Sequence, residues 1–234
     1  MAYFVVEGNI GAGKSTFMRV VGSLLNAQIV YEPHEAWQNI GGENLLDAFY
    51  KDGNRWAYTF QTYAFITRIF ALEEHIKNTT NPYLLCERSV YADRYCFAKN
   101  AYEMGMMSLL EWNLYCDWFS WFVGKRSPLP AGFIYLRTDP RVCHRRLNKR
   151  NRSEEALVSL DYLSLLHNKH EDWLVHKRDV SALLRDIPVL VLNCDEDFES
   201  SEDLRRIHAG SVADFVVQQT GIDRSSVIAG NVLV

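Results

Sequence analysis

The fold is decided by one stretch near the N-terminus, Gly8-Asn9-Ile10-Gly11-Ala12-Gly13-Lys14-Ser15-Thr16. Its first eight residues fit the phosphate-loop pattern G-x-x-x-x-G-K-[ST]. An apolar strand pattern at residues 3–7 precedes it, and a helical pattern at residues 14–26 follows it. The pattern is specific only between a strand and a helix, which is where it stands here. The stretch therefore predicts a loop that binds the phosphates of a nucleoside triphosphate.

Each part of this loop has a chemical task. Its glycines let backbone N–H groups turn toward phosphate oxygens, and the following helix directs the positive end of its dipole at them. We expect Lys14 to reach the β- and γ-phosphates, and we expect the Ser15 hydroxyl to bind Mg²⁺. ATP, with Mg²⁺ as cofactor, is therefore expected at residues 8–16.

The rest of the chain alternates short apolar runs with long amphipathic stretches, a pattern typical of a parallel sheet with crossover helices. The predicted strands are residues 3–7, 28–32, 83–87, 133–137 and 189–193. The predicted helices are residues 14–26, 55–77, 108–125, 140–149, 160–185 and 201–220. No repeat or linker divides the chain, so we expect one α/β domain, residues 1–234, with a five-stranded parallel sheet flanked by helices.

Charge and cysteine usage exclude several classes of protein. A formal net charge of −4 argues against a dedicated nucleic-acid binder, because phosphate neutralisation needs a basic surface. The five cysteines are an odd number without CxxC spacing, which favours reduced thiols over a disulfide framework or a zinc site. The sequence shows no targeting segment and no apolar run that could span a bilayer. We expect a cytoplasmic protein that binds neither nucleic acid nor membrane.

The kind of phosphate-loop protein follows from other motifs. The GTPase patterns D-x-x-G and [NT]-K-x-D do not occur in the sequence, and Asp195-Glu196 after the last strand is interpreted as a solvated loop rather than a motor ATPase site. Two other predicted strands end in Glu32 and Glu87, so both carboxylates should face the same crevice as the phosphate loop. A general base plus a metal or sugar ligand is the favoured interpretation, because phosphorylation of a hydroxyl needs a carboxylate to orient and accept its proton.

Basic residues concentrate in one segment, from Arg145 to Arg152. A solvated helix end is one explanation of this concentration. In a chain of net charge −4, we favour a lid at approximately residues 146–158, whose arginines close over the donor phosphates. The predicted lid arginines are Arg146, Arg150 and Arg152.

Together these motifs resemble the deoxyribonucleoside kinase family, specifically its branch of deoxycytidine, deoxyguanosine and deoxyadenosine kinases. They occur in family order over most of residues 3–192. The matching segments are GNIGAGKST at 8–16, EP at 32–33 with Trp37, RWAYTFQ at 55–61, ERSVYADR at 87–94, the lid at 146–155, LDYL at 160–163 and HEDWL at 170–174. The resemblance implies a P-loop kinase that uses ATP and Mg²⁺ to phosphorylate the 5′-hydroxyl of a deoxyribonucleoside in nucleotide salvage.

The resemblance also implies roles in catalysis. Glu32 would be the general base on the 5′-hydroxyl, with Arg88 beside it, and Lys14 would bind the donor phosphates. Glu87 would share the magnesium and phosphate network with Ser15.

Nucleoside-binding residues are implied in the same way. The sugar 3′-hydroxyl would be held by Tyr50 and Glu155, and Gln61 would make two hydrogen bonds to the edge of the base. The slot for the base would be walled by Trp37, Phe60 and Phe97. Aromatic faces that stack on a planar base, and one amide that reads its edge, suit this ligand chemically.

Arg68 and Asp93 bear on the choice of substrate. In the branch that accepts purines and cytosine, this charged pair lines the pocket beneath the base, whereas thymidine-accepting members carry small or apolar residues there. We therefore expect deoxyadenosine, deoxyguanosine or deoxycytidine rather than thymidine. A structural ion pair is the alternative, and the pair can serve both purposes. One departure from the family is Gly11, where several animal members have alanine.

Other functions stay open on the sequence alone. A thymidine-accepting or broad-specificity deoxynucleoside kinase comes first, then a nucleoside-monophosphate kinase, then a non-catalytic nucleotide-binding regulator. A monophosphate kinase would need basic residues for the acceptor's phosphate, and residues 31–61 hold only Lys51 and Arg55. The presence of Lys14, Glu32 and Glu87 argues against a regulator.

The predicted helix at residues 108–125 is apolar on two sides. One stripe consists of Trp112, Tyr115, Phe119 and Phe122, and the other of Leu114, Trp118 and Trp121. Such a helix needs to be buried on both sides. A central core helix and a homodimer interface both satisfy this need. With the family resemblance added, we predict a homodimer.

Overall fold

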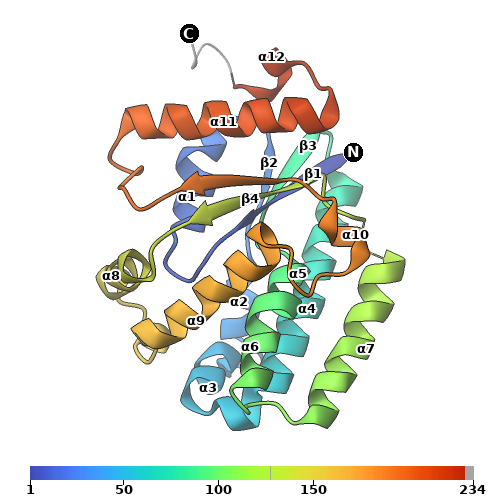
Figure 1. Cartoon of the computed structure of the whole chain (residues 1–234), viewed down its shortest axis with the longest axis vertical. Coiled ribbons are helices and arrows are strands. Elements are labelled where there is room, and N and C mark those ends of the chain that lie inside the picture. Colours follow the sequence, from blue (N-terminus) through green and yellow to red (C-terminus); the bar gives the residue numbers. More distant parts are fainter. Residues whose placement is uncertain (127, 230–234) are drawn as a thin grey trace.

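The computed structural model describes residues 1–126 and 128–229. Its centre is a five-stranded, all-parallel sheet in the order β2-β3-β1-β4-β5 (Figure 1). The strands are β1 (Ala2–Glu7), β2 (Gln28–Val30), β3 (Tyr83–Glu87), β4 (Gly132–Arg137) and β5 (Val189–Asn193). The predicted α/β class and parallel sheet are confirmed. Only β2 departs by more than one residue, because it ends before Tyr31 and Glu32, which were predicted to belong to it.

Burial explains why the strands appear in the sequence as apolar runs. β1 is the central strand; it pairs with β3 on one side and with β4 on the other. Its residues from Tyr3 to Glu7 are all buried. Parallel strands end at a common edge of the sheet, and ligands bind outside that edge in folds of this kind. Here the edge brings the ends of β1 and β3, and with them Glu7, Glu87 and the start of the phosphate loop, close together.

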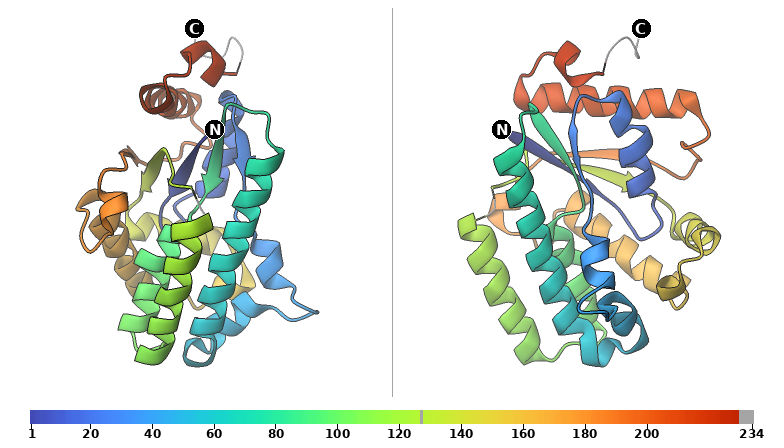
Figure 2. Two further views of the ribbon diagram at one scale, coloured as in Figure 1. Left: turned by 90° about the vertical axis from the view of Figure 1, so that its right-hand side faces the viewer. Right: turned by 180° about the vertical axis from the view of Figure 1, so that it is seen from behind.

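Helices cover both faces of the sheet (Figures 1 and 2). One face carries a hydrophobic core that includes Phe4, Phe17 and Val212, closed by α1 (Lys14–Val20), α11 (Glu202–Thr220) and α12 (Arg224–Val227). The other face carries a second core that includes Phe65, Tyr91 and Phe133. Three helices that contact one another cover this second face, namely α4 (Gly53–Asn78), α6 (Ala98–Glu103) and α7 (Leu109–Arg126).

Several short helices were not predicted from the sequence. They are α2 (His34–Gln38), α3 (Leu45–Lys51), α5 (Val90–Ala92), the π-helical turn η2 (Asp93–Phe97) and α6. Segments of one or two turns leave too few residues for a periodicity to be read. The α2 and α3 pair is separated by Gly41 and Gly42, both with positive φ, which the sequence did indicate as a loop.

Two predicted helices are interrupted. The segment 14–26 consists of α1 and the 3₁₀ turn η1 (Gly22–Leu24). The segment 160–185 consists of α9 (Leu160–His170), the π-helical turn η4 (Glu171–Val175) and α10 (Ala182–Arg185). Lys177 and Asp179 adopt left-handed φ values of 53° and 52°, so a right-handed helix cannot continue from η4 to α10.

α7 is an outer helix rather than a central one. Tyr115 is fully buried, and Trp112, Phe119 and Phe122 pack against the core beneath it, as predicted for the first stripe. The second stripe is open, because Leu114, Trp118 and Trp121 are 42–45% exposed. Among the helices of the described residues, none combines the length and the apolar character needed to cross a bilayer.

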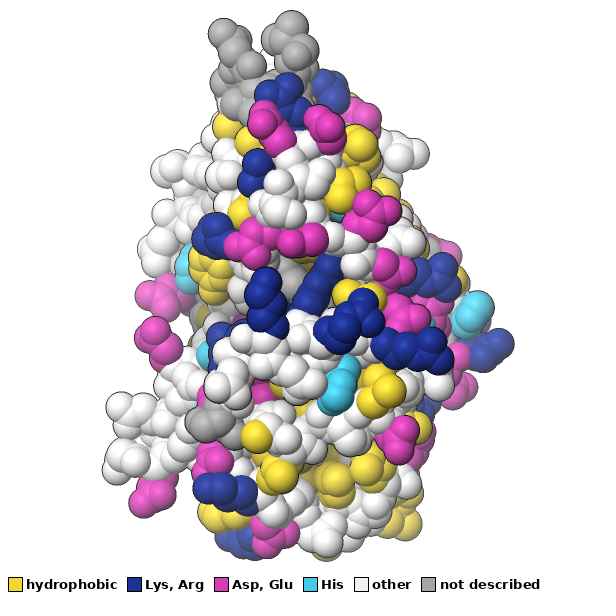
Figure 3. Space-filling view, turned by 90° about the vertical axis from the view of Figure 1, so that its left-hand side faces the viewer, with side chains coloured by type: hydrophobic (Ala, Val, Ile, Leu, Met, Phe, Trp, Pro, Cys, Tyr) yellow, Lys and Arg dark blue, Asp and Glu magenta, His cyan; other side chains and the backbone are white. Residues whose placement is uncertain are grey.

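The predicted lid begins in α8 (Pro140–Arg150) and continues into the 3₁₀ turn η3 (Ser153–Glu155). α8 starts with a proline in its first turn and with the Asp139 side chain accepting a hydrogen bond from the Arg141 backbone N–H, and it ends at Asn151 with a φ of 52°. Figure 3 faces the α8 end of the molecule and shows Lys and Arg side chains gathered in a band across that face. The basic segment of the sequence is thus a basic surface.

Candidate active site

The phosphate loop connects β1 to α1 at the carboxyl edge of the sheet. Gly11 and Gly13 have φ values of 76° and 92°, which L-residues other than glycine seldom adopt. Lys14 folds back over the loop and donates hydrogen bonds from Nζ to the carbonyl oxygens of Gly8 (3.1 Å) and Asn9 (2.9 Å). Burial, and then the charge of Arg88, lower the pKa of Lys14 to about 8. A phosphate at this position would restore a full positive charge on the lysine by pairing with it.

Ser15 and Glu87 form the beginning of a cation site. The Ser15 hydroxyl donates to Oε1 of Glu87 at 2.6 Å, and both residues line the cavity described below. The described residues contain no cluster of three or more side chains that could hold a metal by themselves. Mg²⁺ bound with a nucleotide needs only one or two protein oxygens, with phosphates and water supplying the rest. A hydroxyl and a carboxylate beside Lys14 fit that requirement.

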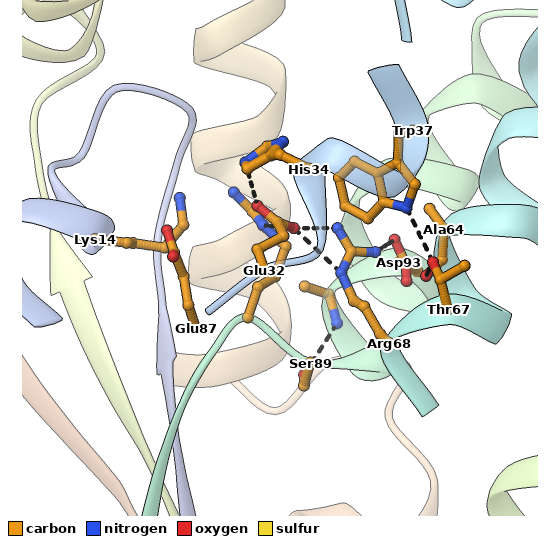
Figure 4. Close-up of polar contacts among 12 residues, drawn as sticks. Lys14, Glu32, His34, Trp37, Ala64, Thr67, Arg68, Glu87, Ser89 and Asp93 are labelled. Atoms are coloured by element: carbon orange, nitrogen blue, oxygen red, sulfur yellow. Dashed lines mark hydrogen bonds and ion pairs between the residues drawn. The ribbon is translucent and has the colours of Figure 1, made fainter. Parts of the chain in front are cut away.

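Glu32 is the most highly contacted carboxylate at this edge (Figure 4). It follows β2 and is buried, and its Oε1 accepts hydrogen bonds from the guanidinium of Arg68, with Nε at 3.1 Å. Nε of Arg88 also lies 3.1 Å from Oε1, and Nε2 of His34 lies 3.0 Å from Oε2. Burial alone would raise the pKa of Glu32, but Arg68, Arg88 and His34 together hold the pKa well below its usual range. Glu32 is therefore an ionised carboxylate facing the cavity.

Arg88 is placed by an unusual backbone conformation. Its φ is 63°, and its backbone N–H donates to the carbonyl of Val6 at 2.9 Å, which ties the turn after β3 to the end of β1. The guanidinium lies 4.4 Å above the ring of Phe97. Left-handed conformations of residues other than glycine are uncommon and concentrate at functional sites. The turn thus holds Arg88 between the catalytic carboxylate candidate and an aromatic wall.

A slot with aromatic walls lies on the far side of Glu32 from the phosphate loop. Trp37, Phe60 and Phe97 line it, and Trp37 is fixed by a hydrogen bond from Nε1 to Oγ1 of Thr67 (2.9 Å). Gln61 is 1% exposed, yet neither Oε1 nor Nε2 of its amide has a hydrogen-bond partner among the described residues. An unpaired buried amide costs free energy, about 1–3 kcal/mol, unless a ligand satisfies it.

Arg68 joins Glu32 to Asp93. Its Nη1 pairs with Oδ1 of Asp93 while the other guanidinium atoms contact Glu32, and all three side chains are buried (Figure 4). Burial raises the pKa of Asp93 to about 6, although the charge of Arg68 opposes this. Asp93 begins the π-helical turn η2, which also carries Phe97. Turns of this kind inside helices are frequent at functional sites.

Three residues of the predicted lid, Arg150, Arg152 and Glu155, line the cavity. Nη2 of Arg150 donates to both carboxylate oxygens of Glu155 at 2.6 Å, and Arg152 lies 3.7 Å from the same carboxylate. Tyr50 lines the cavity with Glu155, and their predicted contact with the sugar 3′-hydroxyl stays a prediction. Gln38 of α2 also donates to Glu154, so the lid contacts the acceptor side of the cavity.

Arg146 does not lie with Arg150 and Arg152, the other two predicted lid arginines. It donates to the carbonyl of Ala12 at 3.3 Å and to those of Asp195 (3.3 Å) and Glu196 (2.8 Å), and it does not line the cavity as Arg150 and Arg152 do. Its guanidinium lies 5.8 Å from the ring of Phe198, in a segment for which the sequence predicted no site. Arg146 thus links the phosphate loop to residues 195–196 outside the cavity.

One cavity of about 270 Å³ collects most of the predicted residues. Of the residues predicted to bind ATP or magnesium, its lining includes Ile10, Gly11, Gly13, Lys14, Ser15, Thr16, Glu87, Arg150 and Arg152. Of those predicted to bind the nucleoside, it includes Glu32, Trp37, Tyr50, Phe60, Gln61, Arg68, Arg88, Asp93, Phe97 and Glu155. Besides Arg146, the predicted residues outside its lining are Gly8, Asn9 and Ala12. Asn9 instead ties the loop to α9 by donating to the Leu163 carbonyl at 2.8 Å, and Ala12 is buried against Cys143 and Leu147.

Four residues that line the cavity had no predicted role. They are His34, Leu46, Phe49 and Tyr162. Phe49 stacks on Phe60 with ring centroids 4.8 Å apart. His34 stands two residues after Glu32, a spacing that is no chemical signal by itself, and Leu46 and Phe49 belong to the unpredicted helix α3.

Comparison with known proteins agrees with this geometry. A family model described as deoxynucleoside kinase matches residues 4–217. The chain belongs to the deoxynucleoside kinase family. Deoxycytidine kinase 2 of Gallus gallus is 41% identical over 221 residues, which cover 84% of this chain and 83% of that protein. Deoxycytidine kinase of Homo sapiens is 39% identical over 218 residues, covering 83% of this chain and 84% of that protein.

A relative that is named for a different substrate is about equally similar. The mitochondrial deoxyguanosine kinase of Xenopus laevis is 39% identical over 218 residues, which cover 84% of this chain and 82% of that protein. The predicted family and enzyme class are thereby confirmed: the protein is an ATP-dependent phosphotransferase of deoxynucleoside salvage. Because deoxycytidine and deoxyguanosine kinases match about equally well, identity alone does not choose between their bases.

Proposed function

We propose that the protein transfers the γ-phosphoryl group of ATP to the 5′-hydroxyl of deoxycytidine, deoxyguanosine or deoxyadenosine, in preference to thymidine. One observation carries the proposal. The buried carboxylate of Glu32 shares a cavity with the phosphate-loop lysine, Lys14, on one side and with the unpaired amide of Gln61 on the other. A cation for the donor phosphates, a carboxylate for the hydroxyl proton and an amide for the edge of the base would thus share one cavity.

On the donor side, Lys14 and the loop backbone would bind the phosphates of ATP, and Ser15 and Glu87 would hold Mg²⁺. A bound Mg²⁺ would neutralise charge on the β- and γ-phosphates. Arg150 and Arg152 line the same end of the cavity and would stabilise the charge of the transferred group. Glu155 pairs with both arginines, so ATP would compete with this carboxylate for them.

On the acceptor side, Glu32 would orient the 5′-hydroxyl and accept its proton. Its depressed pKa makes it a weak base, because two arginines stabilise the carboxylate. A weak base suffices for this chemistry, since the transition state of phosphoryl transfer is loose and positioning supplies most of the catalysis. The new O–P bond would form as the bond between the γ-phosphorus and the bridging oxygen of ADP breaks, and the hydroxyl proton would pass to Glu32.

The choice of base would depend on Arg68 and Asp93, which lie with Gln61 in the lining of the cavity. A carboxylate can accept from an exocyclic amino group, and a guanidinium can donate to a ring nitrogen or a keto oxygen. A thymine methyl would occupy the volume that these side chains need. Because Arg68 also contacts Glu32, the base and the reacting hydroxyl would share one cation.

We also propose that the protein is a homodimer that uses the exposed stripe of α7. Leu114 and Trp118 are large apolar side chains on the outer face of this helix, with 42% and 44% of their surface exposed. Exposed apolar patches on soluble proteins commonly mark interaction sites. The cytoplasmic location expected from the sequence stays a prediction.

A test of the function is phosphorylation of the four deoxynucleosides with ATP and Mg²⁺, with the 5′-monophosphates separated and quantified. We expect at least one of deoxycytidine, deoxyguanosine and deoxyadenosine to have a higher kcat/KM than thymidine. A thymidine preference would remove the proposed substrate choice and leave the kinase assignment standing.

The role of Glu32 has its own test. Glu32→Gln should lower kcat by about 10²–10⁴-fold, the usual contribution of general acid–base catalysis, with little change in nucleoside KM. The control is Glu35→Gln, which makes the same chemical change at an exposed position of α2. Unchanged turnover in folded Glu32→Gln protein would exclude Glu32 from the reaction.

A further inference from the structure

His34 contacts the proposed base directly. It is the first residue of α2, and its backbone N–H donates to the carbonyl of Glu32 at 2.8 Å across Pro33. This tight turn directs the side chain back toward the carboxylate, so that Nε2 lies 3.0 Å from Oε2 of Glu32 (Figure 4). The histidine side chain is 30% exposed, and the carboxylate is 4% exposed. A local motif of three residues therefore provides a donor at the mouth of the cavity.

The two oxygens of Glu32 have different surroundings. Arg68 and Arg88 both contact Oε1, whereas His34 contacts Oε2. A carboxylate oxygen has two lone-pair sites. With guanidinium groups from two residues on Oε1, the oxygen with room for a hydroxyl is Oε2, and one of its two sites is taken by His34. The histidine contact thus determines which lone pair faces the substrate.

The imidazole ring is held in one orientation. It packs edge-to-face on Trp37, with ring centroids 5.0 Å apart, and Trp37 is itself fixed by its hydrogen bond to Thr67. Nδ1 of His34 is buried and has no hydrogen-bond partner among the described residues. A buried nitrogen without a partner is tolerated more easily as a bare acceptor than as an N–H donor of an imidazolium. This fits a ring that carries a proton on Nε2 and donates it to Oε2 of Glu32.

We propose that His34 is a positioning residue that aims the Oε2 lone pair of Glu32 at the 5′-hydroxyl of the nucleoside. The inference rests on the proposed function of Glu32. His34 donates from Nε2 throughout, while the hydroxyl proton passes to Oε2 as the O–P bond forms. Without this donor the carboxylate would be held at Oε1 alone and could rotate about its last side-chain bond. The nucleoside would still bind, but its hydroxyl would meet the base in fewer of the bound complexes.

Two substitutions of His34 distinguish the effect of losing the hydrogen-bond donor from the effect of losing the ring. His34→Leu removes the donor, and His34→Gln retains an amide N–H donor at about the position of Nε2. Single-turnover rates with saturating ATP, Mg²⁺ and the preferred deoxynucleoside isolate the chemical step from product release. We expect His34→Leu to lower this rate about tenfold or more with nucleoside KM changed less than about threefold. We expect His34→Gln to recover most of the loss.

A double mutant shows whether His34 acts through Glu32. In a Glu32→Gln background, adding His34→Leu should change the residual rate by less than about twofold, because effects of residues that act as a unit are not additive. The control substitution is Glu35→Gln, on the same helix and exposed. Circular dichroism and nucleotide binding confirm that each variant is folded.

Three results would overturn the inference. One is a His34→Leu rate equal to that of the wild type, and another is an equal loss in His34→Leu and His34→Gln. The third is a His34→Leu loss that persists in full in the Glu32→Gln background, which would mean that His34 acts apart from the base and would leave the proposed function intact. An unchanged rate in Glu32→Gln alone would instead overturn the proposed role of Glu32, and the role of His34 with it.

Discussion

Glu7 is a buried carboxyl that none of the proposed steps uses. It ends β1, and its Oε1 accepts hydrogen bonds from the backbone N–H (3.0 Å) and the hydroxyl (2.5 Å) of Ser89. Through this contact the last residue before the phosphate loop holds the turn that carries Glu87 and Arg88. Burial raises the pKa of Glu7 from an ordinary 4.5 to about 7, and the nearby charge of Arg88 limits the rise. The turn is therefore fastened by a group that changes charge near neutral pH.

The raised pKa of Glu7 makes the folded protein less stable as the pH rises. A carboxyl whose pKa is higher in the folded state binds a proton more tightly there, so the free energy of unfolding falls as pH rises from about 4.5 to about 7. The total loss is about 3 kcal/mol, from roughly 1.4 kcal/mol for each pH unit. We expect Glu7→Gln, which keeps an acceptor for Ser89 and cannot ionise, to be equal in stability to the wild type near pH 4.5 and more stable at pH 8.

Urea unfolding of both proteins from pH 4.5 to pH 8 measures this difference. Other titrating groups are common to the two proteins, so they cancel in the comparison. A gap between the two stabilities that does not change with pH would show that Glu7 does not titrate in this range.

For single residues, the sequence identified the side chains that stand in recognisable motifs. It missed side chains whose role is set by a contact that forms only in the folded chain. Lys14, Glu32 and Gln61 stand in motifs, and all line the cavity. Arg146 stands four residues before Arg150 and so shares its face of α8, yet only Arg150 lines the cavity. The guanidinium of Arg146 is held by carbonyl oxygens of the phosphate loop and of residues 195–196, whereas that of Arg150 pairs with Glu155. His34 was missed because an imidazole two residues from a glutamate signifies nothing until a turn folds it back.

Among the elements, the phosphate loop and α8 are in direct backbone contact. A Cβ atom built on Gly11 would lie 2.5 Å from the carbonyl oxygen of Cys143, in the middle of α8. Backbone atoms cannot move aside as the end of a flexible side chain can, so any larger residue would displace α8. Because the arginines of the predicted lid begin in α8, the loop and the lid share this contact.

We therefore expect Gly11→Ala to destabilise the fold and to weaken ATP binding. The left-handed φ of 76° costs an alanine about 1–2 kcal/mol, and the contact with α8 adds to this. KM for ATP should rise about tenfold, because we propose that the loop and the lid both bind phosphate. Gly105→Ala is the matched control, since Gly105 has the same φ of 76° and nothing within 4 Å of its Cβ position. Equal effects of the two substitutions on stability and on KM would show that the contact with α8 carries no energetic weight.

The elements that the sequence predicted well are those with enough residues to show a period or a continuous apolar run. β3 and β5 were predicted at their observed bounds because each is a short, mainly apolar run that directly follows a proline, Pro82 and Pro188. The long α4 was predicted nearly whole. The short α2 and α3 were not, although they supply His34, Trp37 and Phe49 to the cavity. Their conformations are set by packing over the cavity rather than by local preference, which a single sequence does not reveal.

For the molecule as a whole, the exposed stripe of α7 is an apolar surface that a single chain does not bury. Leu114→Glu combined with Trp118→Glu would place two charges in the proposed dimer interface. We expect the wild type to have twice the 27.1 kDa mass of one chain in light scattering at micromolar concentration, and the double variant to have the mass of one chain. Burying unpaired carboxylates is unfavourable, so the effect should exceed a hundredfold in the dimer dissociation constant, or about 3 kcal/mol.

Leu183→Glu is the control for that prediction, because Leu183 is 65% exposed on α10, outside α7. Its mass should equal that of the wild type. A wild type that has the mass of one chain at every concentration would contradict the proposed dimer.

The order of the strands also dictates when the phosphate loop can form. β1 is made first, but it pairs with Tyr83–Glu87 and with Gly132–Arg137, and β4 in turn pairs with β5 at Val189–Asn193. Pairing between segments so far apart in sequence folds slowly, because long loops must close first. At roughly 5–20 residues per second, the ribosome needs on the order of ten seconds to reach Gly132 after β1 has been made. Tyr83–Glu87 is made within that interval, so the apolar strand Ala2–Glu7 can gain one neighbour before the other. Until Gly132–Arg137 follows, the strand that leads into the phosphate loop is paired on one side only.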